Sequence, residues 1–410
     1  MRDKNFKNVP KPSPSLIHIG DDKCCGCSAC SSGCPQTAIH MVLNSEGFYR
    51  PSVLEGACNQ CMLCLKYCPI NHTADCEDKE LAESDIMAAW STDNDNHLTS
   101  SSGGIFSELA KSVLADSGVV CGCAWGEGWT PRHILIDSID GLASLKGSKY
   151  IPSLIHEGLF REIIDLAKEG TTVLFCGTPC QVAGLDLAAP AEARANMLLV
   201  DLVCHGVPSL TSFHSYLDYR FGSRDSIKHF SFRNKEISVQ TICAIDQSGL
   251  KYLKTCGQNS WFRAAMVYHL FLQKICFTCP FGNVSRPGDI TLGDFWGIPE
   301  EWRHRSGDSL VLANTPKGKD LVQSLVWQRN IRILKSDYST ASKEIGRIRG
   351  AVYSVPLLRR LALGFIESDN YRRAATCCYV PMRFYERFAG SLNRRLARLK
   401  RLIHLTRKKP

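Results

Sequence analysis

The sequence predicts two structural parts: a small α+β module at the N-terminus, followed by a larger mixed α/β domain with a partly parallel sheet. Eight cysteines form two dense runs before residue 70, which sets the module apart. Between residues 171 and 209, apolar strands, tight loops and helices alternate, which is the rhythm of a parallel sheet. After residue 221, three segments alternate as antiparallel strands do. The 410 residues suffice for about two to three domains.

The two cysteine runs share one spacing. The first is Cys24-x2-Cys27-x2-Cys30-x3-Cys34-Pro35, and the second is Cys58-x2-Cys61-x2-Cys64-x3-Cys68-Pro69. This spacing is typical of bacterial two-cluster ferredoxins, in which three close thiolates bind one cubane and the fourth binds the other. We therefore expect a ferredoxin-like domain over residues 16–75 with two [4Fe–4S] clusters. One is expected on Cys24, Cys27, Cys30 and Cys68, and the other on Cys58, Cys61, Cys64 and Cys34.

Structural zinc and disulfides are the alternatives for these runs. Zinc sites usually use two Cys-x2-Cys pairs separated by a longer loop. Disulfides need an oxidising compartment, and residues 1–20 lack the apolar core of a signal peptide. Cluster thiolates must stay reduced, so 21 cysteines indicate the cytoplasm. Cys25 and Cys76 fall outside the register and are not expected to be ligands.

The first half of the larger domain contains two loops that could receive a phosphate. Residues 37–42 and 46–51 read as the strands of the module, 77–85 as an acidic linker, and 86–90 as a strand. The loop Ser102-Gly103-Gly104 then opens a helix over 105–114, and a helix N-terminus attracts anions. Ser and Gly are equally common as plain helix caps. Strands are expected at 119–125 and 133–137, followed by a helix at 139–145. A second loop comes next and contains Gly147, Ser148, Lys149 and Tyr150. Lys149 could meet a negative charge and Tyr150 could stack on a ring, although an exposed turn is the simpler alternative.

Two further cysteines follow parallel strands. After a helix at 154–167, the strand 171–175 leads to Cys180, and the strand 197–203 leads to Cys204. The carboxyl ends of parallel strands share one edge of the sheet, where ligands bind. His205 is a candidate proton donor because of its ordinary pKa, and a hydrogen-bonded structural histidine is the alternative.

The second half predicts antiparallel strands at 227–232, 239–245 and 251–255 and a helix at 261–273. That helix leads to Cys276-x2-Cys279, which alone could be a zinc, redox or structural pair. With Cys180 and Cys204 it makes the set of four that a third cubane needs. A strand at 289–292 and strands at 309–313 and 331–334 around a helix at 319–327 complete the pattern. The remaining cysteines are expected to pack as small apolar residues: Cys121, Cys123, Cys176, Cys243, Cys256, Cys377 and Cys378.

The net charge of +9 belongs to the C-terminal tail. Residues 382–410 hold ten Lys or Arg and one Glu, which leaves 39 of each sign elsewhere. This balance does not suggest a nucleic-acid-binding domain. In the tail, Leu392, Leu396, Leu399 and Ile403 fall on one helical stripe among arginines. Such a helix could lie on an anionic membrane or dock on a partner. No apolar run is long enough to span a bilayer.

Five ordered motifs resemble the coenzyme F420 hydrogenase/dehydrogenase beta subunit family, over roughly residues 20–345. They are SSGGIFSELA, GSKYIPS, VLFCGTPCQVAGL, DLVCHGVPS and PGDITLGDFWG, and the double cysteine run matches long members of that family. The resemblance implies an N-terminal region (86–170) with flavin loops and a C-terminal region (171–345) with an inner cluster, followed by the tail (346–410). It implies FAD contacts from Ser102 to Gly104 and from Lys146 to Tyr150. It implies an inner [4Fe–4S] cluster on Cys180, Cys204, Cys276 and Cys279.

The function expected from this resemblance is an iron–sulfur flavoprotein oxidoreductase. Ferredoxin or a similar donor would feed the N-terminal clusters, and the inner cluster would pass electrons to FAD and on to a two-electron acceptor. The family also includes a plant chlorophyll reductase, so the resemblance does not fix the substrate. We therefore do not predict coenzyme F420 as the substrate of this protein. One alternative is a non-catalytic electron-transfer subunit bound to a redox partner. Another is a peripheral reductase in cell-surface polysaccharide synthesis, which the basic tail motivates.

Overall fold

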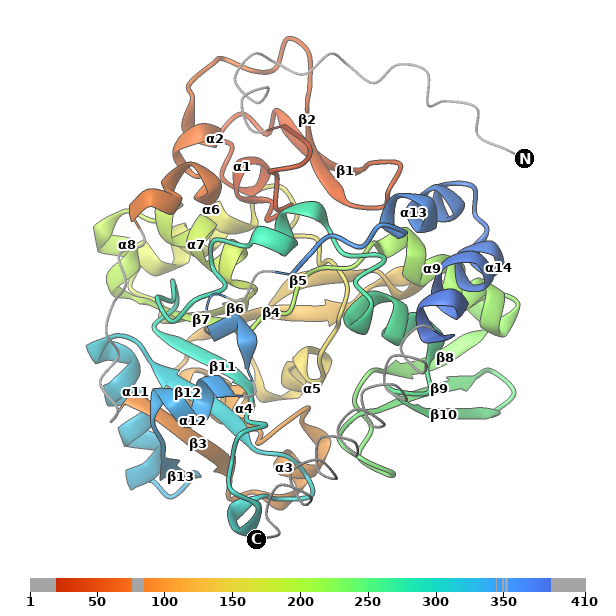
Figure 1. Cartoon of the computed structure of the whole chain (residues 1–410). Coiled ribbons are helices and arrows are strands. Elements are labelled where there is room, and N and C mark those ends of the chain that lie inside the picture. Colours follow the sequence, from red (N-terminus) through yellow and green to blue (C-terminus); the bar gives the residue numbers. More distant parts are fainter. Residues whose placement is uncertain (1–19, 76–84, 344, 349, 351–352, 385–410) are drawn as a thin grey trace, which may run out of the picture.

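The computed structural model describes residues 20–75, 85–343, 345–348, 350 and 353–384 (Figure 1). Most of the expected acidic linker and the whole Leu392–Ile403 stripe fall outside these residues. The expected membrane contact of the tail therefore stays a prediction. No helix in the described ranges is long and apolar enough to cross a bilayer.

The N-terminal module is a hairpin flanked by short helices. Its elements are α1 (Ala29–Ser32), β1 (Ile39–Leu43), β2 (Tyr49–Val53), α2 (Leu63–Lys66) and a 3₁₀ segment (Pro69–Asp75). The two strands pair antiparallel with Ile39 opposite Val53, which confirms the predicted hairpin. Three apolar side chains, Ala38, Ile39 and Val53, pack with cysteines in a very small core. A core of this size needs additional cross-links to be stable, and bound clusters are one kind.

The larger domain is built on an eight-stranded mixed sheet in the order β13-β3-β12-β11-β7-β6-β4-β5. The central strands β4, β6, β7 and β11 are parallel, and the remaining pairs are antiparallel. The strands of this sheet are β3 (Ile86–Ser91), β4 (Val119–Trp125), β5 (Pro131–Ile136), β6 (Val173–Gly177), β7 (Met197–Leu202), β11 (Ile290–Asp294), β12 (Ser309–Ala313) and β13 (Ile331–Lys335). The predicted α/β domain with a partly parallel sheet is thereby confirmed.

Helices cover both faces of this sheet (Figure 1). The residues of β7 show why: Leu198 and Val200 pack on one face, while Met197 and Leu199 pack on the other. A strand buried on both faces is a continuous apolar run, as this one is. The first face carries α4 (Ile105–Ala115), α5 (Leu142–Leu145) and α11 (Pro316–Trp327). The second carries α6 (Leu159–Lys168), α7 (Pro179–Ala188), α8 (Ala191–Ala195) and, beyond β11, α12 (Tyr338–Lys343).

A second, aromatic layer lies beside the sheet. It combines a three-stranded antiparallel sheet, ordered β10-β9-β8, with four helices. Its elements are α9 (Leu210–Phe221), β8 (Ile227–Ser231), β9 (Thr241–Asp246), β10 (Lys251–Thr255), α10 (Ser260–Phe262), α13 (Arg359–Glu367) and α14 (Tyr371–Ala374). Rings of Phe213, Phe232 and Trp261 form its centre. The short helix α3 (Asn94–Thr99) lies apart, after β3.

Two predicted helices are wrong in part. The helix expected over 154–167 begins only at Leu159, because Leu154 pairs with β5 and Gly158 adopts a left-handed φ of 89°. The helix expected over 261–273 ends in a π-helical turn (Arg263–Val267), and His269 has a φ of 56°. Residues 271–273 instead form backbone hydrogen bonds with residues 207–209. This pairing outweighs local helix propensity and brings the segment before Cys276 beside the loop after Cys204.

The N-terminal module is docked closely on the larger domain. The Phe160 N–H of α6 donates to Ser32 Oγ at 2.7 Å. Gln273 Nε2 donates to the Cys24 carbonyl at 2.6 Å. A Cβ added at Gly184 in α7 would lie 2.6 Å from the Ala29 Cβ, so glycine allows α7 to touch α1. Figure 1 shows the module lying over α6 and α7.

Candidate functional site

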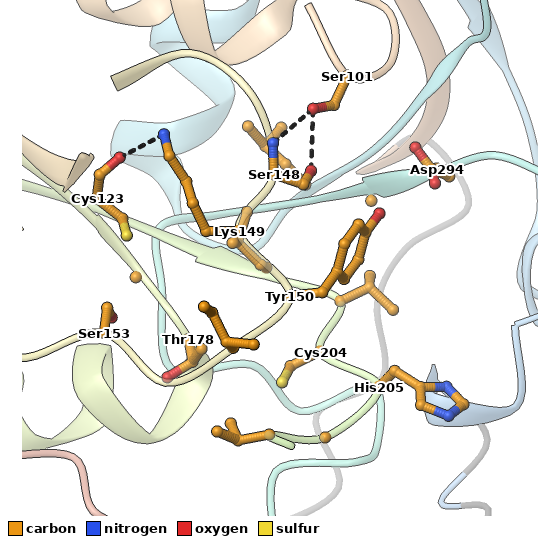
Figure 2. A pocket seen from close by; sticks show the side chains of 18 of the residues that line it. Ser101, Cys123, Ser148, Lys149, Tyr150, Ser153, Thr178, Cys204, His205 and Asp294 are labelled. Carbon is orange, nitrogen blue, oxygen red and sulfur yellow. Dashed lines mark hydrogen bonds between the residues drawn. The ribbon is translucent and has the colours of Figure 1, made fainter. Parts of the chain in front are cut away.

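A cavity of about 820 Å³ opens at the carboxyl ends of the parallel strands. Its walls come from the loop before α4, the loop after α5, the turn between β6 and α7, the loop after β7 and the start of the N-terminal module. Figure 2 shows several of these side chains, among them Ser148, Tyr150, Thr178, Cys204 and His205. This location is the edge at which open α/β sheets bind ligands.

The two loops predicted to receive a phosphate meet at this cavity. Ser101 Oγ accepts from the Ser148 N–H at 2.8 Å and lies 3.0 Å from Ser148 Oγ (Figure 2). Gly104, at a φ of 86°, precedes the first turn of α4, which lines the cavity. The first N–H groups of a helix have no helical acceptor and are available to an anion. Ser102 and Gly147 also line the wall.

Gly103, expected as a flavin contact, packs against β3 and β12 instead of lining the cavity. It is not among the lining residues; its N–H donates to Ser309 Oγ and its carbonyl accepts from the Ser91 N–H. A Cβ at this position would lie 2.3 Å from the Ala89 carbonyl oxygen. Glycine is therefore required here for close packing of the loop on β3 and β12, and its N–H is not free for a ligand.

The Lys149 ammonium donates hydrogen bonds to backbone carbonyls of the protein itself. It donates to the carbonyls of Cys123 at 2.8 Å and Lys146 at 2.9 Å, and to two further carbonyls at the end of α5. Figure 2 shows the side chain directed toward Cys123. Burial lowers the pKa of Lys149. The expectation that this ammonium meets a ligand charge is therefore not supported by its geometry; it instead fixes the second loop on α5.

Tyr150 is held in place by Arg233, whose Nε donates to the phenol oxygen at 2.8 Å. The same guanidinium pairs with Asp294 at the end of β11. The Tyr150 ring packs edge to face against Phe232 and Phe262. Burial raises the pKa of Tyr150, so the hydroxyl remains protonated near neutral pH. Tyr150, Arg233 and Asp294 thus form one rigid wall of the cavity.

The cysteines of the N-terminal runs gather in two groups. In one group, burial raises the thiol pKa values of Cys24, Cys30 and Cys68, that of Cys68 to about 12. Cys68 also interacts with Cys27 and Cys24, and Cys30 interacts with all three. In the other group, Cys64 interacts with Cys58, Cys61 and Cys34. We call these the first set (Cys24, Cys27, Cys30, Cys68) and the second set (Cys34, Cys58, Cys61, Cys64). Each set combines three cysteines of one run with the last cysteine of the other.

The four cysteines of the larger domain also gather, in what we call the inner set (Cys180, Cys204, Cys276, Cys279). Burial raises the thiol pKa of Cys204 to about 12, and the thiols of Cys180 and Cys279 add to this rise. Cys276 interacts in the same way with all three. The Val207 N–H donates to Cys276 Sγ at 3.4 Å. Other backbone N–H groups, at Gly206, Gln181 and Phe281, point at Cys204, Cys180 and Cys279 respectively.

A buried arginine lies against the inner set. Arg347 is 4% exposed and donates to the carbonyls of His205 at 2.6 Å and Cys276 at 2.8 Å. Its guanidinium lies 4.2 Å from the centre of the Tyr353 ring, and its Nε has no partner. Among the described residues, no carboxylate lies within ion-pair distance of it. A buried cation of this kind needs an anion nearby.

His205 follows Cys204 in the sequence, and its ring contacts the rings of His269 and Tyr353. Its Nε2 is 3.0 Å from His269 Nε2, and its Nδ1 is 3.4 Å from the Tyr353 hydroxyl. Burial, with smaller contributions from His269 and Arg347, lowers the pKa of His205 to about 3. The imidazole is therefore neutral near pH 7 in this arrangement. Its predicted role as a proton donor stays a prediction.

Several residues at this site were not expected from the sequence. Arg347 and Tyr353 come after the last of the recognised motifs, and nothing in their surroundings marks them. Asp294, by contrast, is part of the PGDITLGDFWG motif and could have been chosen. Cys123 and Cys176, expected to be simple core residues, also line the cavity.

No three Cys, His, Asp or Glu side chains within the described ranges are arranged to hold a single metal ion. Tetrahedral zinc, with Zn–S distances of about 2.3 Å, requires such an arrangement.

Comparison with known proteins identifies the family. Two models match, described as the coenzyme F420 hydrogenase/dehydrogenase beta subunit N-term (residues 86–159) and C terminus (residues 170–337), and together they span more than half of the chain. A solved structure of the F420-reducing [NiFe] hydrogenase complex from Methanosarcina barkeri is similar at 19% identity. The match covers 70% of this chain and 89% of that one, with a TM-score of 0.45. Comparison with curated proteins gives no match. On the two family models, the chain belongs to the coenzyme F420 hydrogenase/dehydrogenase beta subunit family.

Proposed function

We propose that this protein is an iron–sulfur flavoprotein oxidoreductase that carries electrons between a one-electron carrier and a two-electron acceptor. In this proposal the first and second sets each hold a [4Fe–4S] cluster, the inner set holds a third, and the cavity holds FAD. The observation that carries the proposal is a juxtaposition. Cys180 and Cys204 of the inner set line one wall of the cavity, and the loops that meet at Ser101 and Ser148 form another.

The chemistry of the thiols fits iron–sulfur clusters. A cubane holds its four thiolates farther apart than a single ion does, because four iron corners stand between them. Sulfurs of such clusters accept backbone N–H hydrogen bonds, which tune the reduction potential. The donors around the inner set are of this kind. The buried guanidinium of Arg347, whose Nε has no hydrogen-bond partner, would supply compensating positive charge for four thiolates and a cluster.

The cavity walls fit a flavin with a pyrophosphate group. The first turn of α4 contributes N–H groups and the positive end of the helix dipole. Tyr150, rigidly held by Arg233, offers an apolar surface for a ring. Bound clusters would supply one-electron steps and FAD the storage of two electrons.

The chain itself contributes position and exclusion of water. The Cys204 loop and the residues 271–273 are joined by backbone hydrogen bonds, so two ligands of the inner set are held in register. His205 is hydrogen-bonded on both ring nitrogens and orients the loop that carries Cys204. Aromatic side chains close the far wall.

A second candidate function is an electron-transfer subunit that works only with a partner. The family description favours it, because it names a beta subunit of hydrogenases and dehydrogenases. The two functions differ in what the isolated chain can do. A complete enzyme reduces its acceptor alone, whereas a subunit exchanges electrons with artificial carriers but turns over a substrate only in the presence of its partner.

Anaerobic purification followed by iron, sulfide and flavin analysis tests the proposal. About twelve iron atoms and one FAD per chain are expected for three cubanes. The Cys204→Ser variant should lose about four iron atoms, whereas the matched Cys256→Ser variant, altered at a cavity cysteine outside the three sets, should lose none. About eight iron atoms in the natural protein would remove the inner cluster from the proposal. Absence of flavin after incubation with FAD would remove the flavin.

A further inference from the structure

Cys25 lies between two of the cysteine sets. Its thiol lies close enough to the thiols of Cys180 in the inner set and Cys27 in the first set that both raise its pKa. Cys27 belongs to one hydrophobic cluster, and Cys25 and Cys180 pack against that cluster. All three residues also belong to the wall of the cavity. Cys25, which follows the ligand Cys24 in the sequence, therefore lies where the N-terminal module meets the larger domain.

This contact is fixed from both sides. The Cys24 carbonyl is held by Gln273, which follows α10 in the larger domain. Cys180 is held by Thr178, whose Oγ1 lies 3.2 Å from its sulfur. The close approach of α7 to α1 at Gly184 leaves a Cβ built there only 3.8 Å from Cys27 Sγ. The path from Cys27 through Cys25 to Cys180 is therefore part of a rigid interface.

The second set lies farther from the larger domain. Cys61 is exposed, and Met62 beside it is 47% exposed, whereas Cys27 and Cys68 of the first set are 8% and 9% exposed. The two sets are still neighbours, because Cys64 is among the thiols that raise the pKa of Cys30. Among the cysteines of the three sets, Cys61 of the second set is the exposed one, and Cys25 lies between the first set and the inner set.

We propose that Cys25 is a positioning residue for electron transfer, which joins the first set to the inner set. This inference rests on the proposed function, since it requires clusters on both sets. One electron leaves the group bound by the first set, which is oxidised, and enters the group bound by the inner set, which is reduced. The Cys25 thiol keeps its proton and its oxidation state, and no bond forms or breaks. Tunnelling decays less steeply through closely packed atoms than across a gap, so the Cys25 side chain strengthens the coupling between the two sets.

The test compares Cys25→Ala with Cys25→Ser in the full chain, loaded with iron and sulfide under anaerobic conditions. Cys243→Ala is the control, because Cys243 is a buried cysteine that lies in β9, outside every set. Each variant receives less than one equivalent of dithionite per chain. Rapid freezing and electron paramagnetic resonance then follow the movement of the electron from the first set to the inner set.

Cys25→Ala should retain its iron and transfer the electron more slowly by about an order of magnitude. Cys25→Ser, which keeps a shorter hydrogen-bonding group, should fall between the natural protein and Cys25→Ala, and Cys243→Ala should match the natural protein. Transfer at the natural rate in Cys25→Ala, with full iron content, would overturn the inference. Loss of about four iron atoms would also overturn it, because Cys25 would then be needed for cluster binding. About eight iron atoms in the natural protein would instead indicate failure of the proposed function itself.

Discussion

The ion pair between Asp201 and Arg286 allows a quantitative test of how the inner set is held. Both side chains are almost fully buried, at 0% and 1% exposure. Asp201 Oδ1 accepts from Arg286 Nε at 3.0 Å and from Nη2. Oδ2 accepts from the Gly288 N–H at 2.9 Å. The guanidinium also donates to the carbonyls of Leu202 and Phe281 at 2.7 Å each. These carbonyls lie two residues from Cys204 and Cys279, so the pair ties together two loops of the inner set.

The perturbation is Asp201→Asn, which keeps the shape of the side chain and removes its charge. Arg286 is then left as a buried cation without a carboxylate. Breaking a buried pair at one end costs about 3–5 kcal/mol. Since about 1.4 kcal/mol corresponds to a factor of ten, the ratio of folded to unfolded protein should fall by more than two orders of magnitude. Replacing both partners, in Asp201→Leu with Arg286→Met, should cost less than Asp201→Asn alone.

The assay is urea unfolding of the anaerobically purified chain, followed by tryptophan fluorescence. Glu236→Gln is the control, because it breaks an exposed pair with Lys251 and should leave the unfolding midpoint unchanged. The reasoning is refuted if Asp201→Asn unfolds within about 1 kcal/mol of the natural protein with an unchanged slope. It is equally refuted if the double variant is the less stable of the two.

Three further predictions follow from the site. Gly103→Ala should prevent stable folding, because its Cβ would lie 2.3 Å from the Ala89 oxygen, while Gly147→Ala, at a φ of 85° with open space around it, should cost only about 1–2 kcal/mol; thermal unfolding compares them. Burial lowers the pKa of His133 to about 4, so its contribution to stability is present above its unfolded pKa of about 6.5 and is lost as the pH falls. Between pH 7 and pH 5.5 the free energy of unfolding should fall by about 1.2 kcal/mol on this account, and His133→Gln should remove that part of the fall. A chelator should first remove about four iron atoms from the second set, because its Cys61 is exposed. Spectroscopy would follow the loss, and earlier loss of the inner iron would contradict this reasoning.

The sequence predicted the parts of the fold that depend on local pattern. Strand β7 was predictable because a strand that is buried on both faces is a continuous apolar run. Strands β8, β9 and β10 were predictable because a strand that is buried on one face alternates apolar and polar residues. The grouping of Cys180 with Cys204 followed from the topology of a parallel sheet. The helix predicted over 261–273 failed because residues 271–273 pair with a loop sixty residues earlier, and no local pattern records such a partner.

The site was predictable where chemistry requires a residue at a fixed spacing. Cysteine runs and glycine loops are of this kind, although Gly103, predicted as a flavin contact, packs closely on Ala89 and does not line the cavity. Arg347 shows the opposite situation. One arginine among the 49 basic residues has no signature in sequence, and only its burial without a carboxylate distinguishes it. Cys25, dismissed because it lies outside the register, is distinguished only by the two thiols that it contacts.

The place of Arg347 along the chain bears on how the protein is made. Every cysteine of the three sets precedes residue 280, whereas Arg347 follows all of them. Arg359, which ties Leu272 to the loop at Glu46, comes later still. During synthesis on the ribosome, the inner thiols therefore emerge well before the segment that closes over them. If the inner set holds a cluster, as proposed, this interval would leave its thiols accessible to iron and sulfide before the last part of the chain covers them.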